Sequence, residues 1–215
     1  MSNPSIIMHA SIGAGLHSAG AAQGTALVPR FYEGPADIQG DVHLQQRYFT
    51  YQTEAGWVAG KTFNVMFTID RPAKDVWPHL KDFNPWQNSY GHYYSGVLGD
   101  LEGKTFQLGS DPHEPGPHQY KVVRVIPEHL IVLLQPVPQD INTTDFSPDC
   151  HVFMLNEHDG KTVVTALMEH ASLSKDTTEQ DALSPFREVA PESQRKWRDI
   201  FIPTLKNLIY ESSGT

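Results

Sequence analysis

Runs of β-branched and aromatic residues, interrupted by turn residues, recur along the chain from residue 61 onward. The segment TFNVMFTID at 62–70 has the composition of a strand, and about six more strand-like runs follow it between residues 92 and 172. Turns that contain Gly or Pro separate most of these runs, and Asp159-Gly160 between the last two is a strong hairpin signal. The pattern therefore predicts an antiparallel sheet.

Two short helices are predicted directly after the first strand, within RPAKDVWPHLKDFNPW. Val76 and Leu80 stand four residues apart and so share one helical face. Proline kinks or ends a helix, so Pro78 and Pro85 are expected to divide the segment into two. The expected order is a strand, two short helices and then a run of antiparallel strands.

The end of the chain carries one amphipathic pattern, over residues 192–211. Its apolar stripe consists of Trp197, Phe201, Leu205 and Leu208, at spacings of four, four and three. A long helix that follows a series of strands must bury such a stripe, and the concave face of a curved sheet offers a suitable surface.

The first sixty residues differ in composition from the rest. They are rich in Gly, Ala and Ser at first, and the segment 42–57 then carries enough aromatic residues for a docked strand or hairpin. We expect residues 1–60 to be an N-terminal appendage and residues 61–215 to be the ligand-binding domain.

Two segments of this order resemble the Bet v 1/START-like superfamily, also called the SRPBCC or polyketide cyclase and lipid-transport group. They are RPAKDVWPHLKDFNPW and the closing KWRDIFIPTLKNLI, and the resemblance extends over about residues 61–211. It implies an α+β helix-grip fold, in which a curved antiparallel sheet of about seven strands wraps round a long C-terminal helix and two short helices follow the first strand. It also implies an internal cavity for apolar molecules.

Composition and charge narrow the classes of partner. Apolar residues make up 39% and charged residues 19% of the 215 residues, as in an ordinary globular protein. A net charge of −9 without any basic run argues against nucleic acid. No stretch approaches the roughly 18 apolar residues of a membrane span, and no signal-peptide pattern is evident. A single cysteine, Cys150, fits a reducing compartment, so we expect a cytoplasmic monomer or homodimer.

Four polar residues are candidates for acid–base chemistry. His92 and Tyr94 share one face of a predicted strand, where a tyrosine could donate to a ligand carbonyl and a histidine could act as a base near neutral pH. Glu169 ends an otherwise apolar strand, and burial there would raise its pKa and suit it to moving protons. His118 opens another strand. The alternative for each is an ordinary half-buried or exposed strand position.

Other residues are candidates for lining the cavity. Tyr120 and Arg124 share a predicted strand face with His118, and the arginine could either hold a ligand carboxylate or lie on the surface. The candidate ligand-binding residues are Trp86, Tyr120, Arg124, Met168, Phe201 and Leu205. We expect an enclosed apolar pocket on the order of several hundred cubic ångströms among them.

No motif for a cofactor or a metal stands out. The chain has 11 histidines, but it has no HExxH or CxxC spacing, no GxGxxG after a strand, no P-loop and no GxSxG elbow. We therefore expect neither a cofactor nor a metal.

Three functions remain open from the sequence. The first is binding of an apolar or aromatic small molecule, which needs only the cavity. The second is a cofactor-independent cyclase, dehydratase or aromatase that acts on a carbonyl-containing aromatic or polyketide-like substrate and needs acid and base groups converging on one ligand. The third is a protein-interaction or chaperone-like module. A one-residue error in strand parity changes which polar groups share the cavity, so the sequence does not choose between them.

Overall fold

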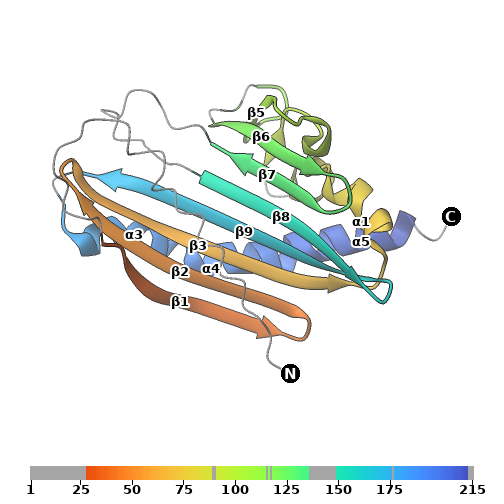
Figure 1. The fold of residues 1–215 in the computed structure, drawn as a ribbon, viewed down its shortest axis with the longest axis horizontal. Coiled ribbons are helices and arrows are strands. Elements are labelled where there is room, and N and C mark those ends of the chain that lie inside the picture. The colour runs from red at the N-terminus through yellow and green to blue at the C-terminus, as the bar shows by residue number, and fades with distance from the viewer. Residues whose placement is uncertain are drawn as a thin grey trace.

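The computed structural model describes residues 28–88, 91–114, 116, 118–135, 149–175 and 177–212. These residues form one curved antiparallel sheet, two short helices and a long, bent helical run at the C-terminus (Figure 1). The predicted helix-grip type of fold is confirmed. The small-residue start of the predicted appendage, residues 1–27, lies outside the described residues.

The sheet has nine strands within the described residues, in the order β1-β2-β3-β9-β8-β7-β6-β5-β4, and each neighbouring pair is antiparallel. The strands are β1 (Arg30–Gln39), β2 (Val42–Thr53), β3 (Gly56–Ile69), β4 (Tyr93–Tyr94), β5 (Thr105–Gly109), β6 (His118–Ile126), β7 (Leu130–Leu134), β8 (Asp149–His158) and β9 (Lys161–Ser174). Seven of them, β3 to β9, correspond to the predicted series.

The other two strands, β1 and β2, continue the same sheet. Pairing between β2 and β3 extends from His43 opposite Met66 to Thr53 opposite Gly56. The domain boundary predicted at residue 60 lies inside β3, and the division into appendage and domain stays a prediction. The sheet therefore has two more strands than the seven that were expected.

The two predicted short helices are α1 (Ala73–Leu80) and α2 (Asn84–Gln87), between β3 and β4. Pro72 has extended backbone angles and starts α1. Pro78 lies within α1, whereas Pro85 is the second residue of α2, in the first turn, where a missing amide proton costs no helical hydrogen bond. A 3₁₀ turn, η3 (Leu98–Asp100), follows β4.

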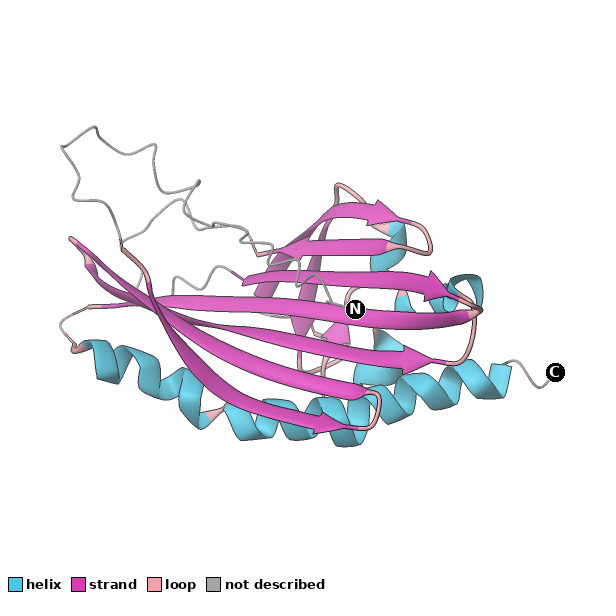
Figure 2. Cartoon of the chain, turned by 60° about the horizontal axis from the view of Figure 1, so that its bottom comes forward, coloured by secondary structure: helices cyan, strands magenta, loops and turns pink. Residues whose placement is uncertain are grey.

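The C-terminal helical run is longer than the predicted 192–211. It consists of α3 (Glu179–Glu188), α4 (Ala190–Lys196), the π-helical segment η4 (Trp197–Phe201) and α5 (Ile202–Ser212). It starts where Thr178 and Asp181 form a capping box, and it extends alongside the sheet in Figure 2. Within the described residues, no helix is long and apolar enough to cross a membrane.

The apolar stripe of this run packs against the concave face of the sheet, which is the face that the helices cover. Trp197, Phe201, Leu205 and Ile209 are at most 6% exposed and belong to the main core. The sheet contributes to that core Leu44, Phe63, Val65, Phe67, Ile69, Phe106, Tyr120, Val122, Val125, Ile131, Leu133, Phe153, Leu155, Val164, Ala166 and Met168. Burial of this apolar surface is the main force that holds the helical run in place.

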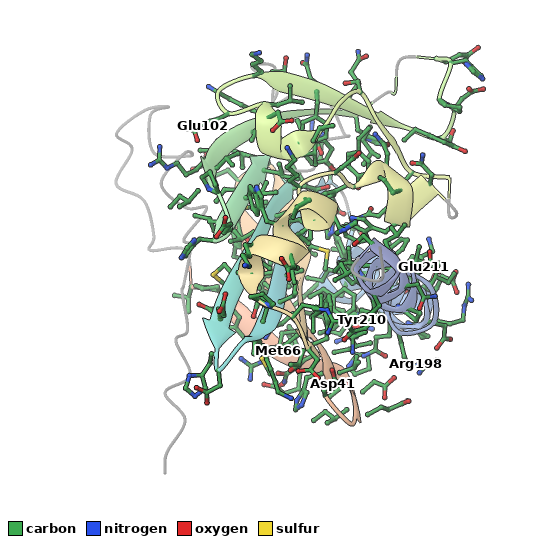
Figure 3. The ribbon with its side chains drawn as sticks, turned by 90° about the vertical axis from the view of Figure 1, so that its right-hand side faces the viewer. Asp41, Met66, Glu102, Arg198, Tyr210 and Glu211 are labelled. Atoms are coloured by element: carbon green, nitrogen blue, oxygen red, sulfur yellow. The ribbon has the colours of Figure 1, made fainter. Side chains whose placement is uncertain are left out.

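Two ion pairs join the helical run to the β1–β2 hairpin. Arg198 Nη1 lies 2.6 Å from Asp37 Oδ2, and Lys206 Nζ lies 2.8 Å from Asp41 Oδ2. Figure 3 shows Asp41 and Arg198 on the same side of the molecule, near the helical run. These pairs fix the added hairpin to the C-terminal end of the chain.

Candidate functional site

Three polar side chains from three strands meet on the concave face of the sheet. Tyr120 of β6 donates its hydroxyl proton to Asp149 Oδ2 at 2.9 Å, and Nδ1 of His170 on β9 lies 2.9 Å from the same oxygen. Asp149, on β8, is 7% exposed and stands directly opposite His170 in the strand register. We call these three residues, together with the neighbouring His151, the carboxylate cluster.

Strand alternation explains why this cluster faces the helices. On β8, Asp149 and His151 share the face of Phe153. On β9, His170 shares the face of Met168. Because Phe153 and Met168 both belong to the main core, the cluster borders that core rather than the outer face of the sheet.

The electrostatics of the cluster favour the charged form of the Asp149 carboxylate. Burial by itself raises the pKa of Asp149, but the hydrogen bond from His170, the charges of His170 and His151 and the bond from Tyr120 outweigh it and hold that pKa below its ordinary value. Burial, together with the Asp149 charge, raises the pKa of Tyr120. Tyr120 is therefore a hydrogen-bond donor to this site across the physiological pH range.

Two further titratable side chains are buried beside the carboxylate. Burial lowers the pKa of His151 to about 3, so the ring is neutral at pH 7. The residue is half-buried, but its Nε2 atom is shielded from solvent and has no hydrogen-bond partner among the described residues. Lys61, opposite His170 on β3, is 8% exposed; burial lowers its pKa, and its Nζ lies 3.4 Å from Ser193 Oγ. Such a concentration of buried ionisable groups marks a candidate site.

A second polar group forms around Gln87 of α2, and we call it the amide cluster. Tyr94 donates its hydroxyl proton to Gln87 Oε1 at 2.6 Å, and His92 Nδ1 lies 3.4 Å from the same oxygen. Burial raises the pKa of Tyr94, and burial with the Lys196 charge lowers the pKa of His92. The structure therefore brings Tyr94 and His92 to one acceptor.

A row of aromatic rings joins the two clusters along the concave face. The centroid of Tyr94 lies 5.9 Å from that of Phe106, which stacks on Tyr120 at 5.4 Å. Tyr120 lies 5.7 Å from His151, and His151 lies 5.0 Å from His170. The row provides a continuous aromatic surface that ends at the buried carboxylate.

The π-helical segment η4 lies against the amide cluster and against α2. The ring of Phe201 lies 6.0 Å from His92, and Trp197 and Phe201 each lie 5.9 Å from Trp86 of α2. Single π turns within α-helices are rare and occur frequently at functional sites. This segment is therefore a second indication that the functional surface lies between the helices and the concave face.

A hollow of about 260 Å³ lies next to the amide cluster. It is lined by Asn84, Asn88, Tyr93, Tyr94, Ser95, Gln107, Asp111, Pro112, Glu114 and Gly116. A second hollow, of about 480 Å³, lies between α1 and the end of α5. Neither of these two hollows is lined by Trp86, Phe201 or Leu205, so the enclosed apolar pocket predicted beside those residues stays a prediction.

Five of the predicted ligand-binding residues lie in the main core. Trp86, Leu205, Phe201, Tyr120 and Met168 are 0%, 1%, 4%, 5% and 7% exposed. The indole Nε1 of Trp86 is shielded from solvent and has no hydrogen-bond partner among the described residues. Because buried N–H groups are normally bonded, this atom is a candidate contact for a ligand oxygen.

Glu169 lies on the opposite face of β9 from the carboxylate cluster. Its register partner is Cys150, which alternates with the inward-facing Asp149 and His151. Burial raises the pKa of Glu169 to about 7, as expected for a shielded carboxyl group. The predicted catalytic pairing of Tyr94 with Glu169 is nevertheless not formed, because the two side chains are on different faces of the sheet.

Two of the predicted site residues, His118 and Arg124, are exposed on β6. His118 begins the strand, and Arg124 Nη1 lies 3.0 Å from Glu102 Oε1, which Figure 3 shows at the periphery. Strict alternation would put Arg124 on the face of Tyr120, but a register shift between Val122 and Arg124 turns it outward. Arg124 therefore does not face the interior, because the β-bulge turns its side chain to the surface.

Sequence reasoning missed Asp149, His151 and Lys61. Asp149, His151 and His170 offer one ligand atom each, all within 4.8 Å of one another, although no metal site was expected. Their spacing along the chain matches no metal motif, because two come from one strand and the third from its neighbour. The available signal was the pair of polar residues at alternate positions of the strand-like run DCHVFML.

No family model matches the chain, and no curated protein matches it. Among solved structures, protein MLL2253 from Mesorhizobium loti has 16% identity and a TM-score of 0.46, over 70% of this chain and 97% of that chain. Norcoclaurine synthase from Thalictrum flavum has 13% identity and a TM-score of 0.45, over 72% and 88%. CalU16 from Micromonospora echinospora has 15% identity and a TM-score of 0.37, over 86% and 95%.

These likenesses are of overall fold and carry no argument about chemistry. The Bet v 1/START-like resemblance read from the sequence holds at the level of fold, because the sheet, the two short helices and the C-terminal helical run stand in the order that it implied.

Proposed function

We propose that the protein binds a small aromatic or apolar molecule that carries a carbonyl or hydroxyl oxygen, and that it transfers protons to or from this molecule. The observation that carries the proposal is the hydrogen bonding of both Tyr120 and His170 to one buried oxygen of Asp149. A carrier of apolar molecules needs only an apolar enclosure. Burying an acid and a base is costly, so their joint presence on the helix-covered face favours an enzyme.

The residues of the carboxylate cluster have complementary roles in this proposal. In the structure the single Tyr120 hydroxyl proton is donated to Asp149 Oδ2. When the ligand binds, the hydroxyl group turns to donate that proton to the ligand oxygen instead, and the Asp149–His170 pair accepts a proton from the adjacent carbon or oxygen. An acid and a base within one hydrogen bond of each other can polarise a carbonyl and remove a neighbouring proton in one step. Enolisation, cyclisation and dehydration all require one group that donates a hydrogen bond to the oxygen and another that accepts the proton.

The aromatic row supports an aromatic or flat apolar ligand. Phe106 and Tyr120 already stack on each other, so the concave face favours parallel ring contacts. We therefore propose a flat ligand that contains an aromatic ring.

The proposal is tested by proton exchange into an aryl methyl ketone in D₂O, followed by NMR. Tyr120→Phe removes only the hydroxyl group and should lower the exchange rate by roughly 10²–10⁴ while probe affinity, followed by tryptophan fluorescence, changes only a few fold. Tyr210→Phe is the matched control, because Tyr210 is 37% exposed and lies on α5. Equal exchange rates for Tyr120→Phe and the parent protein would rule out the proposed acid.

A binding protein without catalysis is the second candidate, and it is favoured by Trp86 Nε1, which has no hydrogen-bond partner in the part of the chain that the structure describes. A ligand oxygen bound there would satisfy the indole N–H without any proton transfer. If the parent protein binds the ketone but exchanges no protons above the buffer rate, and Trp86→Phe weakens binding, the carrier function replaces the enzymatic one.

A further inference from the structure

We infer that Asp149, His151 and His170 bind one divalent transition-metal ion on the concave face of the sheet. Their ligand atoms all lie within 4.8 Å of one another. Asp149 and His151 are two residues apart on β8 and point to the same face, and His170 stands opposite Asp149 on β9. Two rigid neighbouring strands therefore supply the three corners of a compact site.

The donor set is one that metals of this class use. Two imidazole nitrogens and one carboxylate oxygen bind Zn²⁺ or Fe²⁺ in sites that leave a coordination position open. Zinc bonds of about 2.0–2.1 Å in tetrahedral geometry separate the ligand atoms by about 3.3 Å. The 2.9 Å between Asp149 Oδ2 and His170 Nδ1 is close to this separation, and the His151 ligand atom lies within 4.8 Å of both, so side-chain rotations would bring all three groups to one ion.

His151 provides an independent observation. Its Nε2 atom is shielded from solvent and has no hydrogen-bond partner among the described residues. A buried ring nitrogen normally has a donor, an acceptor or a metal ion beside it. A cation bound by this nitrogen together with Asp149 and His170 would supply the missing partner.

The surroundings support the same assignment. The Tyr120 hydroxyl donates to Asp149 Oδ2, as outer groups do when they orient a metal-binding carboxylate. The carboxylate therefore has an orienting partner. Lys61 on the adjacent strand β3 interacts with the charge of Asp149, and a bound cation would displace it toward Ser193 Oγ on α4, from which its Nζ lies 3.4 Å.

This inference rests on the proposed function for the role of the ion and changes that function in one respect: Asp149 and His170 bound to an ion would be its ligands and would no longer accept the proton of the bound molecule. An open coordination position beside Tyr120 would accept the oxygen of the bound molecule, and a divalent cation there would act as a Lewis acid. Binding of the ion needs no organic ligand, so it can be measured by itself.

The test uses the full chain without a histidine tag, titrated with Co²⁺ and followed by visible absorption and equilibrium dialysis. We expect one Co²⁺ per chain. His151→Gln and His170→Gln should each weaken binding by at least about 100-fold, because each removes a direct ligand. His158→Gln is the matched control, since His158 is also on β8 but its side chain is 89% exposed.

Two outcomes overturn the inference. One is the absence of stoichiometric Co²⁺ binding by the parent chain, and the other is equal affinity in His151→Gln and the parent. His151→Gln is the decisive variant, because its Nε2 has no hydrogen bond to lose among the described residues, so the fold should tolerate the change. Circular dichroism of each variant checks this.

Proton exchange measured with and without EDTA separates the two proposals. Exchange that is unaffected by EDTA in a chain that binds no Co²⁺ rejects the metal site and leaves the proposed function standing. Specific Co²⁺ binding without any proton exchange retains the metal site and rejects the proposed catalysis.

Discussion

Nδ1 of His170 lies 2.9 Å from Oδ2 of Asp149, and the two residues stand directly opposite each other on β9 and β8. Their side chains are 28% and 10% exposed, so the contact is largely withdrawn from water. Because Tyr120 of β6 binds the same oxygen, Asp149 connects three strands at one point of the concave face.

Replacing Asp149 by Asn should destabilise the fold by about 1–3 kcal/mol, because hydrogen bonds to a buried charge are lost or weakened. Urea unfolding in the presence of EDTA measures this change. Asp100→Asn is the control: Asp100 pairs with Lys81 at an exposed position, so its loss should cost no more than about 1 kcal/mol. Equal midpoints for the two variants would show that the buried contact contributes no more than the surface pair.

Phe201→Ala should destabilise the protein by about 3–5 kcal/mol, because the ring is 4% exposed and packs against Trp86 and Trp197. Asn207→Ala, at an exposed position of α5, should change stability by no more than about 0.5 kcal/mol. Guanidinium or urea midpoints provide the comparison. Similar shifts in both variants would contradict the assignment of the buried stripe.

The conformation of the turn between β8 and β9 can be tested by mutation. Asp159 and Gly160 have φ angles of 51° and 71°, as in a type I′ turn. A Cβ at Gly160 would meet nothing within 4 Å, so Gly160→Ala should cost about 1–2 kcal/mol from the left-handed conformation alone. Gly160→Asn should cost less than half as much, because Asn tolerates this region. Equal thermal unfolding midpoints for both variants would argue against the turn type.

Glu179 should make stability depend on pH. Its carboxylate accepts hydrogen bonds from Tyr32, Thr50 and Arg30, and these lower its pKa below the ordinary 4.5. A lowered carboxyl pKa contributes stability that is fully present above pH 4.5 and is lost as the pH falls through the lowered value. Glu179→Gln should therefore reduce the unfolding temperature at pH 7, and the difference from the parent should shrink below pH 4.5.

Glu54→Gln is the control for this measurement, because Glu54 lies in the exposed turn between β2 and β3. Its unfolding temperature should follow the parent at every pH. If Glu179→Gln lowers the unfolding temperature equally at pH 7 and at pH 3, the negative charge of Glu179 does not contribute to stability. The hydrogen bonds of this side chain would then be what holds the start of α3 to β1 and β2.

Local patterns were sufficient for most of the elements. The Asp159-Gly160 turn, the two short helices after β3 and the buried positions of Trp197, Phe201 and Leu205 follow from rules that involve neighbouring residues only. These rules work because turn geometry and helical periodicity depend on a few consecutive residues. Strand β1 was harder to predict, since its alternation is broken by a register shift between Glu33 and Ala36, whereas β2 lies within the segment 42–57 where a docked strand or hairpin was expected.

The candidate site could be predicted only in part. Tyr94, His92 and Tyr120 were selected from the sequence as polar residues on strand faces, and the structure places all three near the buried clusters. Arg124 is turned outward by the bulge in β6, because one extra residue exchanges the two faces of a strand. In so short a strand, the hydrophobic pattern of the sequence does not reveal a bulge.

The sequence by itself determined the order of the elements, the helix-grip type of fold and the types of polar residue available for chemistry. Only the tertiary structure decided that Asp149 and His170 meet, because strand register joins residues that are 21 positions apart (170 − 149). It also placed His170 on the concave face and Glu169 on the opposite one. Successive strand residues point to opposite sides, so which of the two faces the core depends on packing across the whole sheet.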